Sequence, residues 1–194
     1  MIQTRGEGAV TSETRQTDAF TRVEGGAGIN IAMAIGAASS VDVRAQGNIL
    51  PLIETKVTDG TLRIQSSKGF TSSEKVEVVL ATPELERIVL TGGSRGTVDG
   101  LASDDFDVEL TGGSVLTATG TTSRLTLAVS GGSVAELDGL TAATVDVDLT
   151  GGSRAEVRAT DAVEGSATGG SRVGVAGGAN AMIDTTGGAQ VERR

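Results

Sequence analysis

The sequence predicts an all-β protein, and more specifically a right-handed parallel β-helix (solenoid) with rungs of roughly 20 residues. Three observations lead to this fold class. The pentapeptide LTGGS at residues 90–94 recurs along the chain with little change. Apolar and polar residues alternate on both sides of each copy, as in a strand with one buried face. The chain holds only 2 prolines, and we find no segment with helical periodicity.

The repeat has a steady period and a steady phase. Its glycine pairs begin at residues 92, 112, 131, 151, 169 and 187, so the steps are 20, 19, 20, 18 and 18 residues. Before the first pair, Ile88 and Leu90 share one side of a strand, and Ser94, Gly96 and Val98 continue the same phase after it. A unit this short cannot bury its apolar face alone, so the repeats must stack. Because crossovers between parallel strands are right-handed, the coil should be right-handed too.

The glycine pair is interpreted as a corner between two strands. A phosphate-binding glycine loop would open a helix, whereas a further strand follows every pair here. Glycine suits a corner because it adopts positive φ without strain. We expect one buried column of corner serines, whose hydroxyls bond a neighbouring rung or a corner amide: Ser94, Ser114, Ser133 and Ser153. An antiparallel β-prism or sandwich is the alternative, since the same period also fits repeated hairpins.

The chain divides near Pro83 into an N-terminal β-rich portion, residues 1–85, and a GGS-repeat β-helix, residues 86–194. We expect the N-terminal portion to cover the first rung as a lobe or cap and so protect an open sheet edge. Asp59-Gly60 between two alternating segments predicts a tight hairpin. The strands expected in this portion lie at residues 19–23, 29–35, 41–45, 52–57, 61–66 and 75–81.

Composition excludes several classes of function. The net charge of −9 leaves no basic stripe for nucleic acid or an anionic membrane surface. No segment is apolar for the length of a membrane-spanning helix. With no histidine or cysteine, Ser/His/Asp, Cys/His and zinc chemistry are excluded, and we assign no catalytic residue, metal ligand or cofactor. With no Trp or Tyr, any contact with a glycan would have to be polar.

Arginines supply the candidate ligand-binding residues. Arg95, Arg154 and Arg172 each follow the corner serine, with Val115 and Val134 at that position in the two rungs between. Such a column could bind an anionic polymer. The alternative is that these arginines only balance the acidic surface.

Acidic residues supply a second candidate. Asp107 and Glu109 share the outer face of one rung, and Asp146 and Asp148 that of a rung two further along. The spacing would suit a hard cation or an acid/base pair. A solvated outer face is the stronger interpretation, because a neutral rung between them avoids stacking like charges.

The chain resembles a known family. RVEGGAGINIAMAIG at residues 22–36, VDVRAQGNILPLIETKVTDGTLRIQ at 41–65, ATPELERIVLTGGS at 81–94 and the later GGS repeats are similar to the bacterial head GIN domain family. Gly28-Ile29-Asn30 stands where the tripeptide that names the family does. The resemblance runs from about Gly8 to Val191 and implies a β-helix-like adhesin exported to the periplasm or cell surface. It implies no catalytic residue.

The sequence therefore favours a non-enzymatic, exported interaction module whose partner is a polymer, such as a glycan, or a protein of the envelope. Met1 in place of an export signal is read as the result of trimming. One alternative is a structural scaffold that forms homo-oligomers through its long sides. The other is a polysaccharide-active enzyme, which rests on analogy between β-helix folds.

Overall fold

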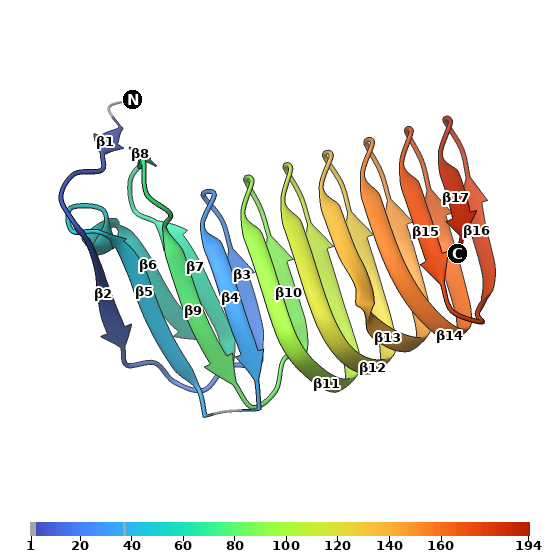
Figure 1. Cartoon of the computed structure of the whole chain (residues 1–194), viewed down its shortest axis with the longest axis horizontal. Coiled ribbons are helices and arrows are strands. Elements are labelled where there is room, and N and C mark those ends of the chain that lie inside the picture. Colours follow the sequence, from blue (N-terminus) through green and yellow to red (C-terminus); the bar gives the residue numbers. More distant parts are fainter. Residues whose placement is uncertain (1–2, 37) are drawn as a thin grey trace.

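The computed structural model describes residues 3–36 and 38–194. The chain winds into a β-solenoid of about 5 turns. Figure 1 shows that the coil is right-handed and flattened into two sheet layers joined by tight loops along the upper edge. We call these layers the front layer and the back layer, as they appear in that view. The core lies between them.

The repeats form the regular part of the solenoid. β10 (Arg87–Leu90) is followed by four long strands, β11 (Arg95–Leu110), β12 (Val115–Val129), β13 (Val134–Leu149) and β14 (Arg154–Ala167). Each long strand descends in the front layer, bends at the lower edge and rises in the back layer. β15 (Arg172–Ala176) and β17 (Gln190–Arg193) complete the front layer, and β16 (Asn180–Thr185) completes the back layer.

Every strand pair between these repeats is parallel. The predicted parallel β-helix is therefore confirmed, and the antiparallel prism or sandwich is wrong. Residues 99–101 and 138–140 stay within β11 and β13, at points where the register between rungs shifts.

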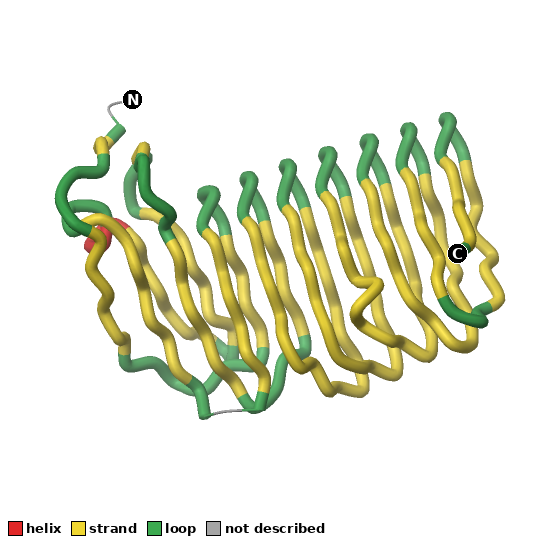
Figure 2. The backbone as a smooth tube through the Cα atoms, viewed as in Figure 1, coloured by secondary structure: helices red, strands yellow, loops and turns green. Residues whose placement is uncertain are grey.

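The glycine pairs form the upper loops, drawn in green in Figure 2. Both glycines of each pair have positive φ, for example 62° at Gly92 and 77° at Gly93. The turn is closed by a bond from the backbone N–H of Ser94 to the carbonyl of Thr91, at 3.3 Å. The first glycine also touches the rung before it, since a Cβ on Gly112 would lie 3.2 Å from the backbone nitrogen of Gly92. Rung stacking and backbone conformation together require glycine here.

The corner serines lie in one buried column, as predicted. Their hydroxyls were expected to bond a neighbouring rung or a corner amide, and this is correct in one case, where the Ser114 N–H donates to Ser133 Oγ at 3.2 Å. The recurring bond is different. Each hydroxyl donates to the carbonyl three residues earlier in its own corner, as Ser114 Oγ does to Thr111 at 2.8 Å. The serine thus satisfies a turn carbonyl that burial would otherwise leave unpaired.

The GIN tripeptide belongs to a further corner of the same kind. β3 (Arg22–Gly25) pairs with β10, and β4 (Asn30–Ile35) pairs with β11. The loop between them therefore stacks on the corner at residues 91–94. Ala27, with φ of 60°, and Gly28, with φ of 70°, take the places of the glycine pair. Ile29 takes the place of the buried serine and is itself fully buried.

The remaining N-terminal strands close the solenoid on the far side of β3 and β4. β7 (Thr61–Ser66) and β9 (Glu77–Thr82) form the next parallel coil. Antiparallel strands then follow: β6 (Ile53–Thr58) on β7, β5 (Ser40–Gln46) on β9 and β2 (Val10–Arg15) on β5. β1 (Thr4–Arg5) pairs with β8 (Phe70–Thr71), and a short 3-10 turn, η1, spans Leu50–Leu52.

The hairpin predicted at residues 59 and 60 is confirmed. Thr58 pairs with Thr61 across the turn, and Asp59 and Gly60 have φ of 49° and 73°. Two consecutive positive φ values are those of a type I′ turn, which matches the twist of the flanking strands. Because β3 and β4 pair directly with β10 and β11, hydrogen bonding between strands is continuous across residue 85.

Arg15 joins the two layers at the N-terminal end. Its guanidinium donates to the carbonyls of Ile53 and Leu50 and to Thr55 Oγ1, and its side chain is 16% exposed. We expect Arg15→Ala to lower the free energy of unfolding by roughly 1–3 kcal/mol, because it removes the guanidinium that donates to the Ile53 carbonyl and is one of two donors to the Leu50 carbonyl, the other being the Ile53 N–H. Arg22→Ala removes an exposed ion pair with Glu86 and should cost less than about 1 kcal/mol. Urea unfolding measures both, and equal effects would contradict a closing role for Arg15.

Candidate functional site

The three predicted arginines do lie in one column on the outer face of the front layer. The register places Arg95 beside Val115, Val115 beside Val134, Val134 beside Arg154, and Arg154 beside Arg172. All three arginines are exposed. At roughly 4.8 Å per rung, Arg172 is one rung from Arg154, whereas Arg95 is three rungs, or about 14 Å, away. The column therefore consists of Arg95, then two valines, then the adjacent pair Arg154 and Arg172.

Arg154 is held by a carboxylate. Glu156 accepts bonds from Arg154 Nη2 at 2.7 Å and Nε at 3.0 Å, and its other oxygen lies 3.2 Å from Arg194 Nη1. The hydrogen bond to Glu156 raises the pKa of the Arg154 guanidinium. Glu156 is only 15% exposed because its carboxylate lies flat over Gly174, where a Cβ would fall 1.9 Å from it.

The other two arginines have free guanidinium groups. Within residues 3–36 and 38–194, neither Arg95 nor Arg172 forms an ion pair or a side-chain hydrogen bond. Arg172 has Arg154 on one side and Gln190 on the other. Sequence reasoning missed the Glu156–Arg194 contact. A signal for this contact was present in the sequence. The last repeat, QVERR at residues 190–194, aligns with RVGVA at residues 172–176, and this alignment places QVERR two rungs beyond Arg154.

The predicted acidic pairs face outward from the back layer, two rungs apart as expected, with Thr126 between Asp107 and Asp146. Arg87 neutralises the first pair, since its guanidinium lies 3.7 Å from Asp107 and 2.7 Å from Glu109. Asp148 accepts a bond from Ser166 at 3.3 Å. Among the described residues, no group of three acidic, histidine or cysteine side chains is arranged to hold a metal ion.

Like charges are not kept apart along the whole back layer. Glu164 lies directly beside Asp146 in the next rung, whereas neutral Ser166 still separates Asp148 from Asp184. The neutral rung expected between acidic rungs is therefore present between Asp107 and Asp146 but absent between Asp146 and Glu164. An open depression of about 510 Å³ is bordered by Met182 and by four acidic side chains: Asp146, Asp148, Glu164 and Asp184.

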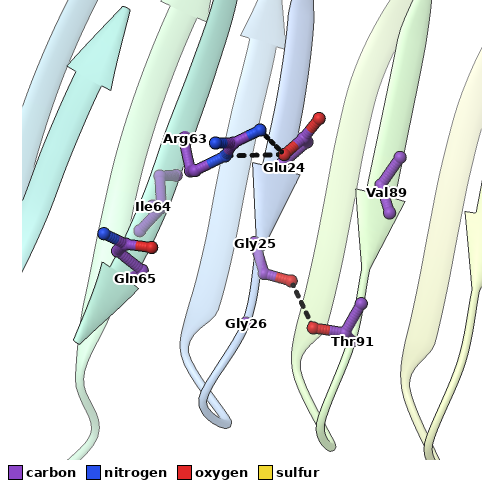
Figure 3. Close-up of a pocket in the computed structure, with 8 residues that line it drawn as sticks. All are labelled: Glu24, Gly25, Gly26, Arg63, Ile64, Gln65, Val89 and Thr91. Atoms are coloured by element: carbon purple, nitrogen blue, oxygen red, sulfur yellow. Dashed lines mark hydrogen bonds and ion pairs between the residues drawn. The ribbon is translucent and has the colours of Figure 1, made fainter. Parts of the chain in front are cut away.

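A smaller depression lies on the back layer near the GIN corner. Figure 3 shows that Gly25 and Gly26 leave a gap between Gln65 of β7 and Thr91 beyond β10, and its volume is about 180 Å³. Arg63 and Glu24 close one side with an ion pair of 2.8 Å, whose hydrogen bond raises the pKa of Arg63. The Glu24 carboxylate in this depression is therefore paired with the Arg63 guanidinium.

Comparison with known proteins identifies the family. The family described as "Putative auto-transporter adhesin, head GIN domain" matches residues 19–179. The chain belongs to this family. The match begins before the GIN corner and takes in the regular rungs as far as the loop before β16. No curated protein matches the chain.

Solved structures share the fold of this head GIN domain at low identity. A putative adhesin from Bacteroides fragilis is 18% identical with a TM-score of 0.78, covering 98% of this chain and 99% of that one. A putative adhesin from Parabacteroides merdae is 14% identical with a TM-score of 0.66 and 99% coverage of both chains. A protein from Parabacteroides distasonis named as a putative lipid binding protein is 11% identical, with a TM-score of 0.62 and 100% coverage of both.

The geometry of this head GIN domain is that of a surface with repeating side chains. In the described part of the chain, no helix is long and apolar enough to cross a membrane. The depression near the GIN corner has its charged groups, Arg63 and Glu24, paired with each other, whereas the depression bordered by Asp146, Asp148, Glu164 and Asp184 is acidic. What the outer faces offer chemically is contact by charge and hydrogen bonding at a spacing fixed by the rungs.

Proposed function

We propose that this head GIN domain is an exported, non-enzymatic adhesion module that binds a repetitive anionic partner, such as an acidic glycan of the envelope or matrix, on its front layer. The observation that carries the proposal is the column running from Arg95 through Val115 and Val134 to Arg154 and Arg172. Family membership supports an adhesive role at the cell surface or in the periplasm.

The mechanism follows from the rigidity of the solenoid. Because each rung is hydrogen-bonded to the next along its length, the arginines are presented at fixed intervals before the partner arrives. A polymer with acidic groups at a matching interval can then bind several positions at once, so weak contacts add up. Arg95 and Arg172 are the primary contacts in this proposal, since Glu156 already engages Arg154.

The test is a glycan array probed with the purified chain and with the triple variant Arg95→Gln, Arg154→Gln, Arg172→Gln. We expect the wild-type chain to bind acidic glycans and the triple variant to lose at least about tenfold in affinity, because each lost charged hydrogen bond is worth roughly 1.5–3 kcal/mol. Among single variants, Arg95→Gln and Arg172→Gln should lose more than Arg154→Gln. Raising the salt concentration should weaken binding.

A matched control removes three arginines from the back layer: Arg22→Gln, Arg63→Gln, Arg124→Gln. It changes the net charge equally and should leave array binding intact. Equal losses in both triple variants, or no binding to any acidic glycan, would contradict the proposal. The bound glycan should also keep its chain length during incubation with the protein; shortening would indicate an enzyme instead. Fractionation of the native bacterium should place the protein outside the cytoplasm.

A further inference from the structure

The three arginines of the front layer have different surroundings. A second outward column runs beside theirs, two residues further along each strand, and we call it the neighbouring column. From rung to rung it holds Thr97, Thr117, Glu136, Glu156, Gly174 and Glu192. Threonines thus stand next to Arg95, whereas carboxylates stand around Arg154 and Arg172. The front layer therefore carries a neutral segment and a segment of mixed charge.

Arg95 is a lone cation in the neutral segment. In its own column it has Asn30 on one side and Val115 on the other. The first carboxylate reached through Asn30 is that of Glu77, one rung further, and it lies 3.6 Å from Arg44. Both neighbours of Arg95 in this column are uncharged, so an acidic group that approaches it there meets no like charge.

Arg154 is the least available of the three arginines. Each oxygen of the Glu156 carboxylate faces a guanidinium, since one accepts from Arg154 Nη2 at 2.7 Å and the other lies 3.2 Å from Arg194 Nη1. Glu136, which is exposed, adjoins Glu156 on the preceding rung. An acidic group of a partner has to displace Glu156 from Arg154 and then lie beside two like charges. This juxtaposition opposes binding at Arg154.

The accessible cations are then Arg95 and Arg172. The column takes four rungs from one to the other, which is about 19 Å. Val115 and Val134 occupy the first two positions between them, and the threonines of the neighbouring column offer hydroxyls beside this stretch. A chain with acidic groups four rungs apart and neutral units between them matches this face.

We propose that the front layer selects a sparsely charged acidic glycan, with neutral sugars between acidic groups about 19 Å apart, and that Glu156 sets this selectivity by neutralising Arg154. The inference rests on the proposed adhesive function and names the class of its ligand. Neutral sugars lie over the two valines, with hydroxyls toward the threonines. A glycan with an acidic group on every sugar also reaches Arg95 and Arg172, but it sets further charges against Glu136 and Glu156.

Two oligosaccharides of equal length test the selectivity by titration calorimetry. One is a homopolymer of uronic acid, and the other is neutral except for two uronic acids about 19 Å apart. We expect the wild-type chain to bind the second at least about fivefold more tightly. Glu156→Gln keeps the shape of the side chain and removes its charge. It should strengthen binding of the homopolymer at least about fivefold and change binding of the other oligosaccharide less than about twofold.

Glu24→Gln is the matched control, because it removes a carboxylate paired with an arginine on the back layer, Arg63, as Figure 3 shows. It should leave both affinities unchanged. A wild-type chain that binds the homopolymer as tightly as the other oligosaccharide, or a Glu156→Gln variant that changes both affinities equally, would overturn the selectivity and leave acidic-glycan binding in place. Binding of neither oligosaccharide would contradict the proposed function, and this inference with it.

Discussion

Gly120→Ala is expected to lower the free energy of unfolding by roughly 4 kcal/mol, whereas Gly113→Ala should lower it by about 1–2 kcal/mol. The two glycines lie seven positions apart in the same rung, and both have positive φ, 127° at Gly120 and 79° at Gly113. They differ in what surrounds them. The comparison therefore separates the cost of backbone conformation from the cost of stacking against another rung.

Gly120 is pressed against the preceding rung at the lower bend. A Cβ there would lie 2.1 Å from the carbonyl oxygen of Leu101 and 2.6 Å from its backbone nitrogen. Backbone cannot move aside as the end of a side chain can, so β11 and β12 would have to separate locally. At Gly113 nothing lies within 4 Å of the same atom, and only the strain of positive φ remains.

Urea unfolding followed by circular dichroism measures both changes, provided that a second probe confirms a single transition. Solenoids can unfold in segments, so amide exchange in β11 and β12 gives an independent local reading. If the two substitutions shift the midpoint equally, close stacking at the lower bend is not what requires glycine at position 120.

The sequence is informative about the regular rungs because each carries its own corner and its own alternation. Phase alone placed Ser94 and its counterparts in one buried column and Arg95 on the outer face. The GIN segment was not recognised as a further corner of the repeat, because Ala27 occupies a positive-φ position normally given to glycine and Ile29 replaces the serine. No local feature of the sequence predicts the order of the N-terminal coils. The coil of β3 and β4 sits between that of β7 and β9 and that of β10 and β11, and such pairing depends on partners far away in sequence.

The candidate site was predictable to a similar degree. Counting back seven residues from each corner serine gives Asp146 before Ser153 and Glu164 before Ser171, so the adjacent acidic pair on the back layer was present in the sequence pattern. The pairing of Arg154 with Glu156 could not be predicted from the sequence pattern. It depends on the absence of a side chain at Gly174, which lets Glu156 lie flat, and on Arg194 from the last rung. Three rungs must be aligned before these contacts exist.

Phe106→Ala should lower the free energy of unfolding by about 3–5 kcal/mol, because it removes a fully buried aromatic ring and leaves a cavity between the layers. The neighbouring rungs show what the site accommodates, since the same inward column continues as Leu125, Val145, Val163 and Ala181. Phe106→Leu copies the next rung and should cost less than about 1.5 kcal/mol.

Thermal and urea unfolding of the two variants measure the difference in stability, and amide exchange shows where along the solenoid it arises. Because each rung contacts only its neighbours, loss of protection should centre on β10, β11 and β12 and leave β15 to β17 near the wild-type rates. Uniform loss along the solenoid would instead mean that the rungs unfold as one cooperative unit.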